Sequence, residues 1–416
     1  MTQPNCVTSR CAKERTAELR PDIRYPGSYR QPDSTAAASI LITYNRLMPS
    51  GTIVVAGAGI IGASIAYHLA RRGARVIVLD AAQPGSGATG KSLGWINATF
   101  SKHPRGYFDL NRSGIAAWRR LEAELCGAID IQWGGSVAWF PPGAEAETLR
   151  ENIRNHQAWG YPVRLVDRYE VQRLLPKVAP GEIAVACHCE SEGAVDPIQA
   201  STTLLTKARA LGADLRYPWP VTGLDLARGR VETNQGSLEA HLFVLACGVD
   251  SPRLAAMARV RVPLKDSPGV LVHTVPAPRL IDRVVLAPGV HFKQGADGRV
   301  VAGGAIVAGA GTAITQASID DAGAIRERLE QYLPALKNVP TERVTLGHRV
   351  MPVDEYPVIG FSEEGFSEEC PNLYIAATHS GVTLAPLVGE WAAIEILDRA
   401  PVDALAPYRP SRFSGS

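Results

Sequence analysis

Three glycines within six residues mark the first place where chemistry can be inferred, in the run Gly57-Ala58-Gly59-Ile60-Ile61-Gly62. Glycines at this spacing allow a tight turn, a close approach of backbone to a pyrophosphate, and close packing of a helix on a strand. Asp80 follows 18 residues after Gly62, where a carboxylate can accept hydrogen bonds from ribose hydroxyls. The pattern predicts a dinucleotide site. An acid at this place disfavours the 2′-phosphate of NADP and leaves FAD and NAD open.

A second run, from Gly85 to Asn97, is rich in small and hydroxyl residues. Hydroxyl and backbone donors suit a pyrophosphate and a ribityl chain, and small residues let the backbone lie against a flat ring. A flexible loop without a ligand could have the same composition. We favour the ligand, and FAD is therefore the expected cofactor. The contacts expected from the two runs are Gly57, Ala58, Gly59, Ile60, Ile61, Gly62, Asp80, Ala81, Ala88, Thr89, Lys91, Ser92, Leu93, Gly94 and Trp95.

The elements that must position these residues form a strand-turn-helix-strand unit. Residues 52–56 and 75–79 are apolar and short enough to be buried strands. Between them lies a helix that ends before Gly73, which stands where a left-handed C-terminal cap belongs. The helix is predicted to bury one stripe, made of Ile61, Ile65 and Leu69.

Periodicity predicts further helices and strands along the chain. The expected helices are 115–125, 145–159, 198–211 and 319–333. Short strands are expected within 215–248 and 269–307, with Ala296-Asp297-Gly298 as a hairpin turn. Residues 373–377 are predicted to form a buried strand that leads into a last helix. The fold class is therefore α/β, with a Rossmann-like FAD-binding domain and a substrate-binding domain on a mixed, largely antiparallel sheet.

The domain boundaries follow from the same pattern. Residues 1–47 lack a sustained period and are expected to be a mobile extension, with an arm that packs on the body as the alternative. The FAD-binding domain is expected to be discontinuous, over 48–110, 180–265 and 340–400. The substrate-binding domain takes 111–179 and 266–339, and residues 401–416 are left as a C-terminal tail.

Composition excludes several classes of protein. Forty-three basic and 41 acidic residues give a net charge of +2, which leaves no basic field for nucleic acid. No apolar run reaches the roughly 18 residues that span a bilayer, so we expect a soluble, cytoplasmic protein. Seven scattered cysteines do not predict a disulfide framework. Cys187-His188-Cys189 has no second pair at zinc-like spacing, and we expect no metal.

Together these motifs resemble the D-amino acid oxidase family of flavoproteins, which includes glycine oxidase, sarcosine oxidase and D-amino acid dehydrogenase. The resemblance covers about residues 52–397, and Glu192-Gly193-Ala194-Val195-Asp196-Pro197 and Val244-Leu245-Ala246-Cys247-Gly248 recur in the family's order. It implies that backbone around Val221 meets the adenine and that Cys247 and Gly248 pass the ribose. It also implies an enzyme that oxidises the CH–N bond of a small amino acid by hydride transfer to the flavin, giving an imine that hydrolyses.

The C-terminal part carries the expectation about the substrate. Arg349 stands five residues before Asp354, which resembles the glycine oxidase pattern and implies a carboxylate-binding arginine beside the flavin. A guanidinium can hold a carboxylate by two parallel hydrogen bonds, although a structural salt bridge is the alternative role. His291, beside Phe292 on an expected strand, is a second candidate for the substrate site, or an ordinary sheet position.

A last loop resembles the family's closing loop, where helix N-terminal donors face the flavin pyrimidine ring and stabilise its reduced, anionic form. Its expected contacts are His379, Ser380, Gly381, Val382 and Thr383. His379 is expected to contact the flavin and not to act as a base. Gly347 falls where sarcosine oxidase has its flavin-linking cysteine, so FAD is expected to be non-covalent.

Alternatives stay open at this point. The substrate could be an amine without a carboxylate or a 2-hydroxy acid, and the chain could be the flavin subunit of a larger dehydrogenase. The electron acceptor could be oxygen or another molecule, and the sequence leaves the oligomeric state open.

Overall fold

The computed structural model describes residues 51–100, 102–304, 316–362 and 372–413. The chain divides into two units, Met1–Leu47 and Met48–Ser416. The expected mobile extension, residues 1–47, lies outside the described residues, and everything below concerns the second unit.

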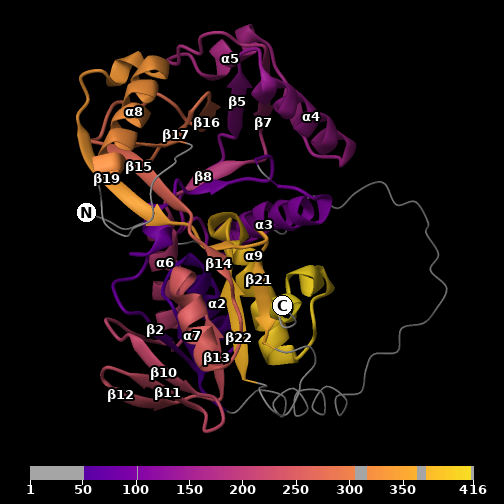
Figure 1. The fold of residues 1–416 in the computed structure, drawn as a ribbon, viewed down its shortest axis with the longest axis vertical. Coiled ribbons are helices and arrows are strands. Elements are labelled where there is room, and N and C mark those ends of the chain that lie inside the picture. Colours follow the sequence, from indigo (N-terminus) through magenta and orange to yellow (C-terminus); the bar gives the residue numbers. More distant parts are fainter. Residues whose placement is uncertain (1–50, 101, 305–315, 363–371, 414–416) are drawn as a thin grey trace, which may run out of the picture. The chain divides into compact units, whose positions relative to one another are not determined.

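A six-stranded sheet, in the order β21-β22-β13-β1-β2-β9, holds the predicted strand-turn-helix-strand unit (Figure 1). Its strands are parallel except for the antiparallel edge strand β21. The central strands are apolar at every position because both faces of the sheet are buried. One face packs on helices, and the other packs on a small sheet and a short helix that contribute Val221, Val231 and Leu254. The strands are β1 Ile53–Ala56, β2 Val76–Leu79, β9 Asp214–Arg216, β13 Leu242–Leu245, β21 Val358–Phe361 and β22 Leu373–Ala377.

Helix α2 (Ile60–Arg71) packs between α6 (Pro197–Ala210) and α9 (Gly381–Ala393). The predicted stripe is right for Ile65 and Leu69, which are fully buried, but Ile61 is only half-buried. The helix is buried on most of its surface because a helix covers it on each side. Gly73 takes the left-handed conformation expected of a C-terminal cap, with φ of 83°.

A second sheet has eight strands, in the order β19-β15-β18-β17-β16-β5-β7-β6. All its pairings are antiparallel except β16 with β5, which matches the predicted mixed, largely antiparallel sheet. Two of its strands, β7 and β19, fall in ranges that the expected division assigns to the FAD-binding domain. The bounds are β5 Ser136–Phe140, β6 Val163–Leu165, β7 Val185–Cys189, β15 Pro268–Thr274, β16 Val284–Ala287, β17 Val290–Gln294, β18 Val300–Gly303 and β19 Thr341–His348.

Three small sheets hold the other strands of the described part of the chain. β3 (Trp95–Ile96), β8 (Gly193–Val195) and β4 (Ile131–Gln132) form one sheet, and β14 (Leu264–Lys265) pairs with β20 (Met351–Pro352). The short strands predicted within 215–248 include β10 Val221–Asp225, β11 Arg230–Thr233 and β12 Gly236–Glu239, which form a third small sheet. Within the described residues, the other α-helices are α3 Arg105–Glu124, α4 Ala144–Ala158, α5 Arg168–Leu174, α7 Ser251–Met257 and α8 Gln316–Tyr332. A short π-helix, Ile394–Asp398, extends α9.

Helix α3 begins ten residues before the predicted start at 115. The sequence of this first part is polar and contains two glycines, which is why periodicity missed it. Gly114 lets this first part of α3 pack closely on α9, because an added Cβ there would lie 2.5 Å from the Thr383 carbonyl oxygen. Close packing on α9, rather than intrinsic propensity, therefore holds this part of the helix.

The segment expected as a C-terminal tail packs on the six-stranded sheet. Leu405 and Tyr408 are buried in the same core as α2 and α9. Arg409 forms an ion pair with the buried carboxylate of Glu395, which also accepts a hydrogen bond from Tyr374 Oη at 2.8 Å. Residues 403–413 therefore stabilise the fold around α9.

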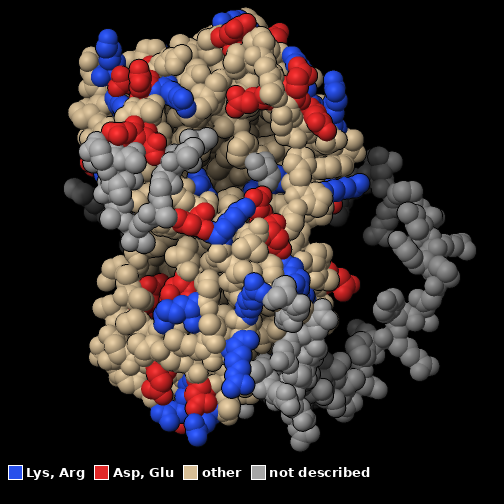
Figure 2. Space-filling view, viewed as in Figure 1, with Lys and Arg blue, Asp and Glu red and all other residues tan. Residues whose placement is uncertain are grey.

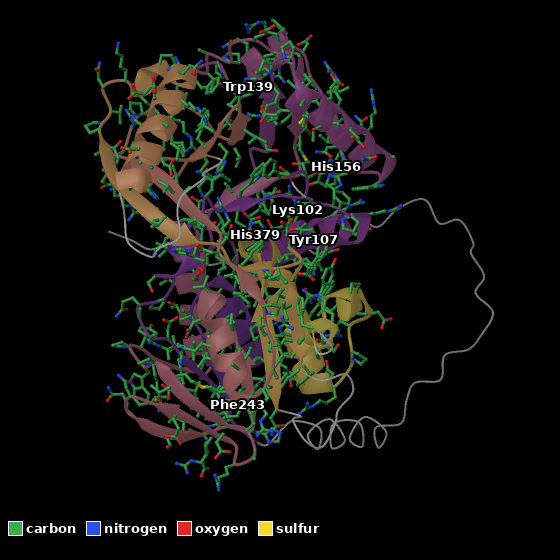
Figure 3. All side chains as sticks on the ribbon, in the orientation of Figure 1. Lys102, Tyr107, Trp139, His156, Phe243 and His379 are labelled. Carbon is green, nitrogen blue, oxygen red and sulfur yellow. The ribbon has the colours of Figure 1, made fainter. Side chains whose placement is uncertain are left out.

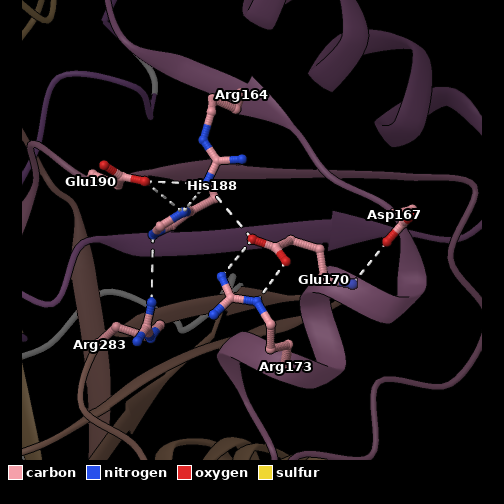
Figure 4. Close-up of polar contacts among 7 residues, drawn as sticks. All are labelled: Arg164, Asp167, Glu170, Arg173, His188, Glu190 and Arg283. Atoms are coloured by element: carbon pink, nitrogen blue, oxygen red, sulfur yellow. Dashed lines mark hydrogen bonds and ion pairs between the residues drawn. The ribbon is translucent and has the colours of Figure 1, made fainter.

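His188 on β7 lies in an ion-pair network, between the guanidinium groups of Arg164 and Arg283 (Figure 4). Burial, with Arg283, lowers the pKa of His188. A neutral imidazole between two cations is a poor place for a metal ion. No group of three His, Cys, Asp or Glu among the described residues could hold one. Within the same residues, no helix is long and apolar enough to cross a membrane.

Candidate functional site

The turn between β1 and α2, and its packing on the helix, require glycine at positions 57 and 62. Gly57 has φ of +109°, and a Cβ there would lie 2.2 Å from the Ala246 carbonyl oxygen. A Cβ on Gly62 would lie 1.9 Å from the Gly57 carbonyl oxygen. The first glycine therefore lets β13 approach the turn, and the last lets the helix close on the strand, as their spacing predicts.

Asp80 and Thr89 bind the backbone of this turn. Asp80 accepts hydrogen bonds from the amides of Ala58 at 2.6 Å and Ala82 at 2.9 Å. Thr89 Oγ1 accepts from the amide of Ile60 at 3.0 Å. A carboxylate has about four acceptor positions, so Asp80 keeps capacity for ribose hydroxyls. Asp80 and Thr89, from the two sides of the predicted site, thus both lie against the turn between β1 and α2.

The N-terminus of α2 fits a pyrophosphate. Its capping residue, Gly59, has no side chain, and its first turn holds no acidic residue. The amides of the first turn and the helix dipole therefore present positive charge to a group bound at this end of the helix. The residues present fit the dinucleotide part of FAD.

Of the residues expected at the adenosine part, Cys247 and Gly248 lie beside the same turn. Cys247 follows β13, and its thiol donates to the Ala56 carbonyl oxygen at 3.1 Å. Gly248 takes φ of +61° next to it. Val221 begins β10, and its carbonyl oxygen accepts from Arg253 at 3.3 Å. Cys247 is therefore beside the turn, and burial raises the pKa of its thiol, which makes it unreactive.

The second run packs against β19 and β8. A Cβ on Gly347 would lie 2.7 Å from Lys91 Cβ, and a Cβ on Gly94 would lie 2.1 Å from the Val195 carbonyl oxygen. Gly94 has φ of +76°, and its amide donates to Ser92 Oγ at 3.2 Å. Glycine is therefore required at position 94 both by conformation and by space.

The start of α9 is tied to the end of that run. Thr383 Oγ1 accepts from the amide of Asn97 at 3.1 Å and lies 3.3 Å from the Trp95 carbonyl oxygen. The Val382 carbonyl oxygen accepts from Trp118 at 2.8 Å. Ser380 caps the helix with φ of +61°, and the first turn holds no acidic residue. Thr383 therefore lies against Trp95 and Asn97, although the two segments are nearly 290 residues apart in the sequence.

Arg349 follows β19 and has no carboxylate partner among the described residues. Its Nη1 donates to the Pro268 carbonyl oxygen at 2.7 Å and lies 3.4 Å from Ser267 Oγ. Its other nitrogen atoms have no acceptor within the described part of the chain. Asp354, five residues on, instead pairs with Arg412 at 2.8 Å. The protein thus binds the guanidinium through Nη1, and its other nitrogen atoms keep N–H donors for an anion.

Two histidines lie near that guanidinium. Burial, with the charge of Arg349, lowers the pKa of His291 to about 4. Burial, with the charges of Lys102 and Arg349, lowers the pKa of His379 to about 3. Both imidazoles are therefore neutral at pH 7. A hollow opens in this face of the molecule at the level of β8 and β17 (Figure 2).

Lys102 and Tyr107 belong to this cluster and were not predicted from the sequence. Lys102 Nζ donates to Ser380 Oγ, and Tyr107 Oη lies 2.9 Å from the same oxygen. Figure 3 shows both beside His379. The stretch around Lys102 is polar and aperiodic, so no signal in the sequence marks this lysine as buried.

Glu192 belongs to one of the family motifs, but its role was not predicted either. This fully buried carboxylate accepts five hydrogen bonds, at 2.6–3.2 Å, from the Trp95 indole, the Ala98 amide, the Thr99 amide and hydroxyl, and the Ser136 hydroxyl. It therefore ties the segment after the second glycine-rich run to β5. Burial raises its pKa.

Replacing Glu192 by alanine is expected to lower the free energy of unfolding by about 3–5 kcal/mol, because several buried donors lose their acceptor. Glu192→Gln should cost less, since the amide oxygen still accepts. Glu190→Ala is the matched control, because that carboxylate is 68% exposed and pairs with Arg164 at the surface. Urea denaturation measures all three, and equal losses for the two alanine variants would contradict the assigned role.

Stability is expected to fall as the pH drops from 6.5 towards 4. Burial lowers the pKa of five histidines to about 3–4, so the unfolded chain binds protons in this window before the folded chain does. The stabilisation that the neutral histidines contribute is complete above pH 6.5 and is lost on acidification. The five histidines are His68, His156, His273, His291 and His379. Urea midpoints at half-unit pH steps measure the slope, and His156→Gln should reduce it. A urea midpoint that does not change between pH 6.5 and 4 would show that burial does not keep these histidines neutral.

Comparison with known proteins agrees with this geometry, which is that of a dinucleotide-binding flavoenzyme. The family model for FAD dependent oxidoreductases, DAO, matches residues 52–394. The chain belongs to this family, and it is an FAD-dependent oxidoreductase.

Similar proteins cover most of the chain. Glycine oxidase of Bacillus licheniformis is 28% identical over 83% of this chain and 92% of its own. A subunit of the opine oxidase of Agrobacterium tumefaciens is 26% identical over 87% of this chain and 97% of its own. The solved structure of glycine oxidase from Geobacillus kaustophilus covers 87% of this chain and 98% of its own, with a TM-score of 0.78 and 23% identity. This likeness confirms the predicted α/β fold.

Proposed function

We propose that this enzyme oxidises the CH–N bond of a small amino acid, a D-amino acid, glycine or an N-alkyl amino acid. The observation that carries the proposal is Arg349, a half-buried guanidinium with free donors and no carboxylate partner among the described residues. A buried cation without a counter-ion favours an anionic ligand. The similarity to glycine oxidase supports an amino acid as that ligand.

FAD, when bound, supplies the acceptor for the hydride that leaves the substrate's α-carbon, and water then hydrolyses the resulting imine to an oxo acid and an amine. Arg349 binds the substrate carboxylate and thereby fixes the α-carbon in one orientation. His291 and His379 remain neutral beside it, so they do not repel the cationic guanidinium. Neither is required to act as a base, because the amine enters the reaction in its neutral form.

FAD binding is proposed to be non-covalent. Gly347, at the place of the flavin-linking cysteine of sarcosine oxidase, has Lys91 packed against its Cα, with room for no side chain. Of the free cysteines in the described residues, Cys187, Cys189 and Cys247 have raised pKa values, which disfavours a nucleophilic thiolate.

An anaerobic titration tests the function. D-Alanine, D-proline, glycine and sarcosine are added in turn to the yellow holoenzyme, and the flavin band near 450 nm is followed. Bleaching by at least one of them is expected. A yellow protein that no amino acid bleaches would refute an amino acid substrate and favour an uncarboxylated amine or a 2-hydroxy acid. Acid precipitation of the same sample should release the colour into the supernatant.

A second candidate is the flavin subunit of a larger dehydrogenase, and the similarity to a protein named as one subunit of an opine oxidase favours it. Admitting air after bleaching separates the two. Rapid return of the yellow colour indicates an oxidase that is complete by itself, whereas slow return indicates an electron acceptor on another protein or a dye-like carrier.

A further inference from the structure

Lys102 is a buried lysine that faces no carboxylate at contact distance. Its side chain is 3% exposed, and Nζ donates to Ser380 Oγ. Within the described residues, no Asp or Glu lies within 4 Å of Nζ, and Glu192 is the one carboxylate whose charge acts on it. Burying an ammonium costs several kcal/mol unless it is paired, so the fold retains this lysine at a cost to stability.

The position of Lys102 increases that cost. Ser380 is the N-cap of α9, so the ammonium lies at the positive end of a 13-residue helix. The Tyr107 ring, whose centroid is 5.4 Å from Nζ, offsets part of this repulsion through its negative face. A cation at a helix N-terminus is the reverse of the usual preference, and such conflicts are common at functional sites.

The charges nearby do not balance. Lys102 and Arg349 are both close enough to lower the pKa of His379, and His379 itself is neutral at pH 7. Glu192 is the anion that opposes Lys102, and its five donors already stabilise its charge. The region around the start of α9 therefore has a positive potential, which an additional negative charge relieves.

We infer that Lys102 is a positioning residue which holds Ser380 at the N-terminus of α9 and supplies positive potential for the negative charge that FAD carries after two-electron reduction. This inference rests on the proposed function. A substrate carboxylate is the other possible source of that charge. It is disfavoured because a lysine that is 3% exposed cannot touch a substrate without rearrangement, whereas its field reaches a fixed cofactor.

Sulfite tests the inference without turnover. Its lone pair forms an S–N bond at flavin N5 and leaves a negative charge on the ring, so its Kd, read from loss of the 450 nm band, reports the local potential. Lys102→Met should raise this Kd about tenfold or more and lower the midpoint potential by about 30 mV for each factor of ten. Lys102→Arg should keep a sulfite Kd near that of the wild type. Lys207→Gln removes an exposed cation on α6 and should also keep the wild-type Kd.

The variants separate charge from packing. Lys102→Met removes a buried charge and is expected to fold, and Lys102→Gln, which keeps a donor for Ser380 without the charge, repeats the test if it does not. A melting temperature that changes while sulfite Kd and potential stay constant overturns the inference, as does a KM effect alone. Wild-type enzyme that binds sulfite but is not bleached by amino acids refutes the proposed function and leaves the Lys102 comparison intact.

Discussion

Replacing Arg349 by alanine is expected to raise the KM for amino acids by about 100-fold or more, because truncating one partner of a buried charge pair costs about 2–5 kcal/mol. The guanidinium is held by Pro268 and Ser267 through Nη1 alone, so its remaining donors are the anchor that the variant removes. Arg349→Lys should be intermediate, since an ammonium cannot form two parallel hydrogen bonds. Steady-state kinetics with D-alanine as the substrate measures the change in KM.

The same kinetics with ethylamine, which is alanine without its carboxylate, is the internal control. Arg349→Ala should leave its oxidation nearly unchanged, because the lost interaction is made only by the carboxylate. Arg343→Ala is the matched variant, since that arginine is exposed on β19, the strand that Arg349 follows. An equal loss of activity on D-alanine and on ethylamine would show that Arg349 is structural.

The parts of the site that sequence could predict depend on local backbone geometry. Gly57, Gly62 and Gly73 each have a conformation or a close approach that glycine alone allows, so the residue type itself records the constraint. Asp80 lies at a fixed distance along the chain from the turn that it binds. Such features are readable because few other roles require the same residues at the same spacing.

Lys102 and Glu192 could not be found in this way, because distant segments create their environments. Lys102 meets Ser380, 278 residues later, and Glu192 meets Trp95, 97 residues earlier. Nothing near either residue in the chain predicts that it is buried, since lysine and glutamate are usually exposed. The same holds for the first part of α3, whose position is set by α9 across Gly114. Sequence reasoning thus finds local constraints and misses those made by packing.

Gly62→Ala is expected to abolish or strongly weaken FAD binding, by about 100-fold or more in Kd, as expected when overpacking strain of a few kcal/mol displaces the turn. The new Cβ would lie 1.9 Å from the Gly57 carbonyl oxygen, which is backbone and cannot move without separating α2 from β1. Absorbance of the purified protein at 450 nm, and titration of apoprotein with FAD, measure the loss.

The sign of the effect makes this variant informative. Gly62 lies in the first turn of α2, where alanine is intrinsically favoured over glycine by up to about 1 kcal/mol. Propensity therefore predicts a gain in stability, and only the close approach of helix and strand predicts a loss. Gly87→Ala is the control, because Gly87 lies in the second glycine-rich run with φ of −76° and no heavy atom within 4 Å of an added Cβ. If Gly62→Ala binds FAD as tightly as Gly87→Ala does, the close approach at Gly62 is not what builds the cofactor site.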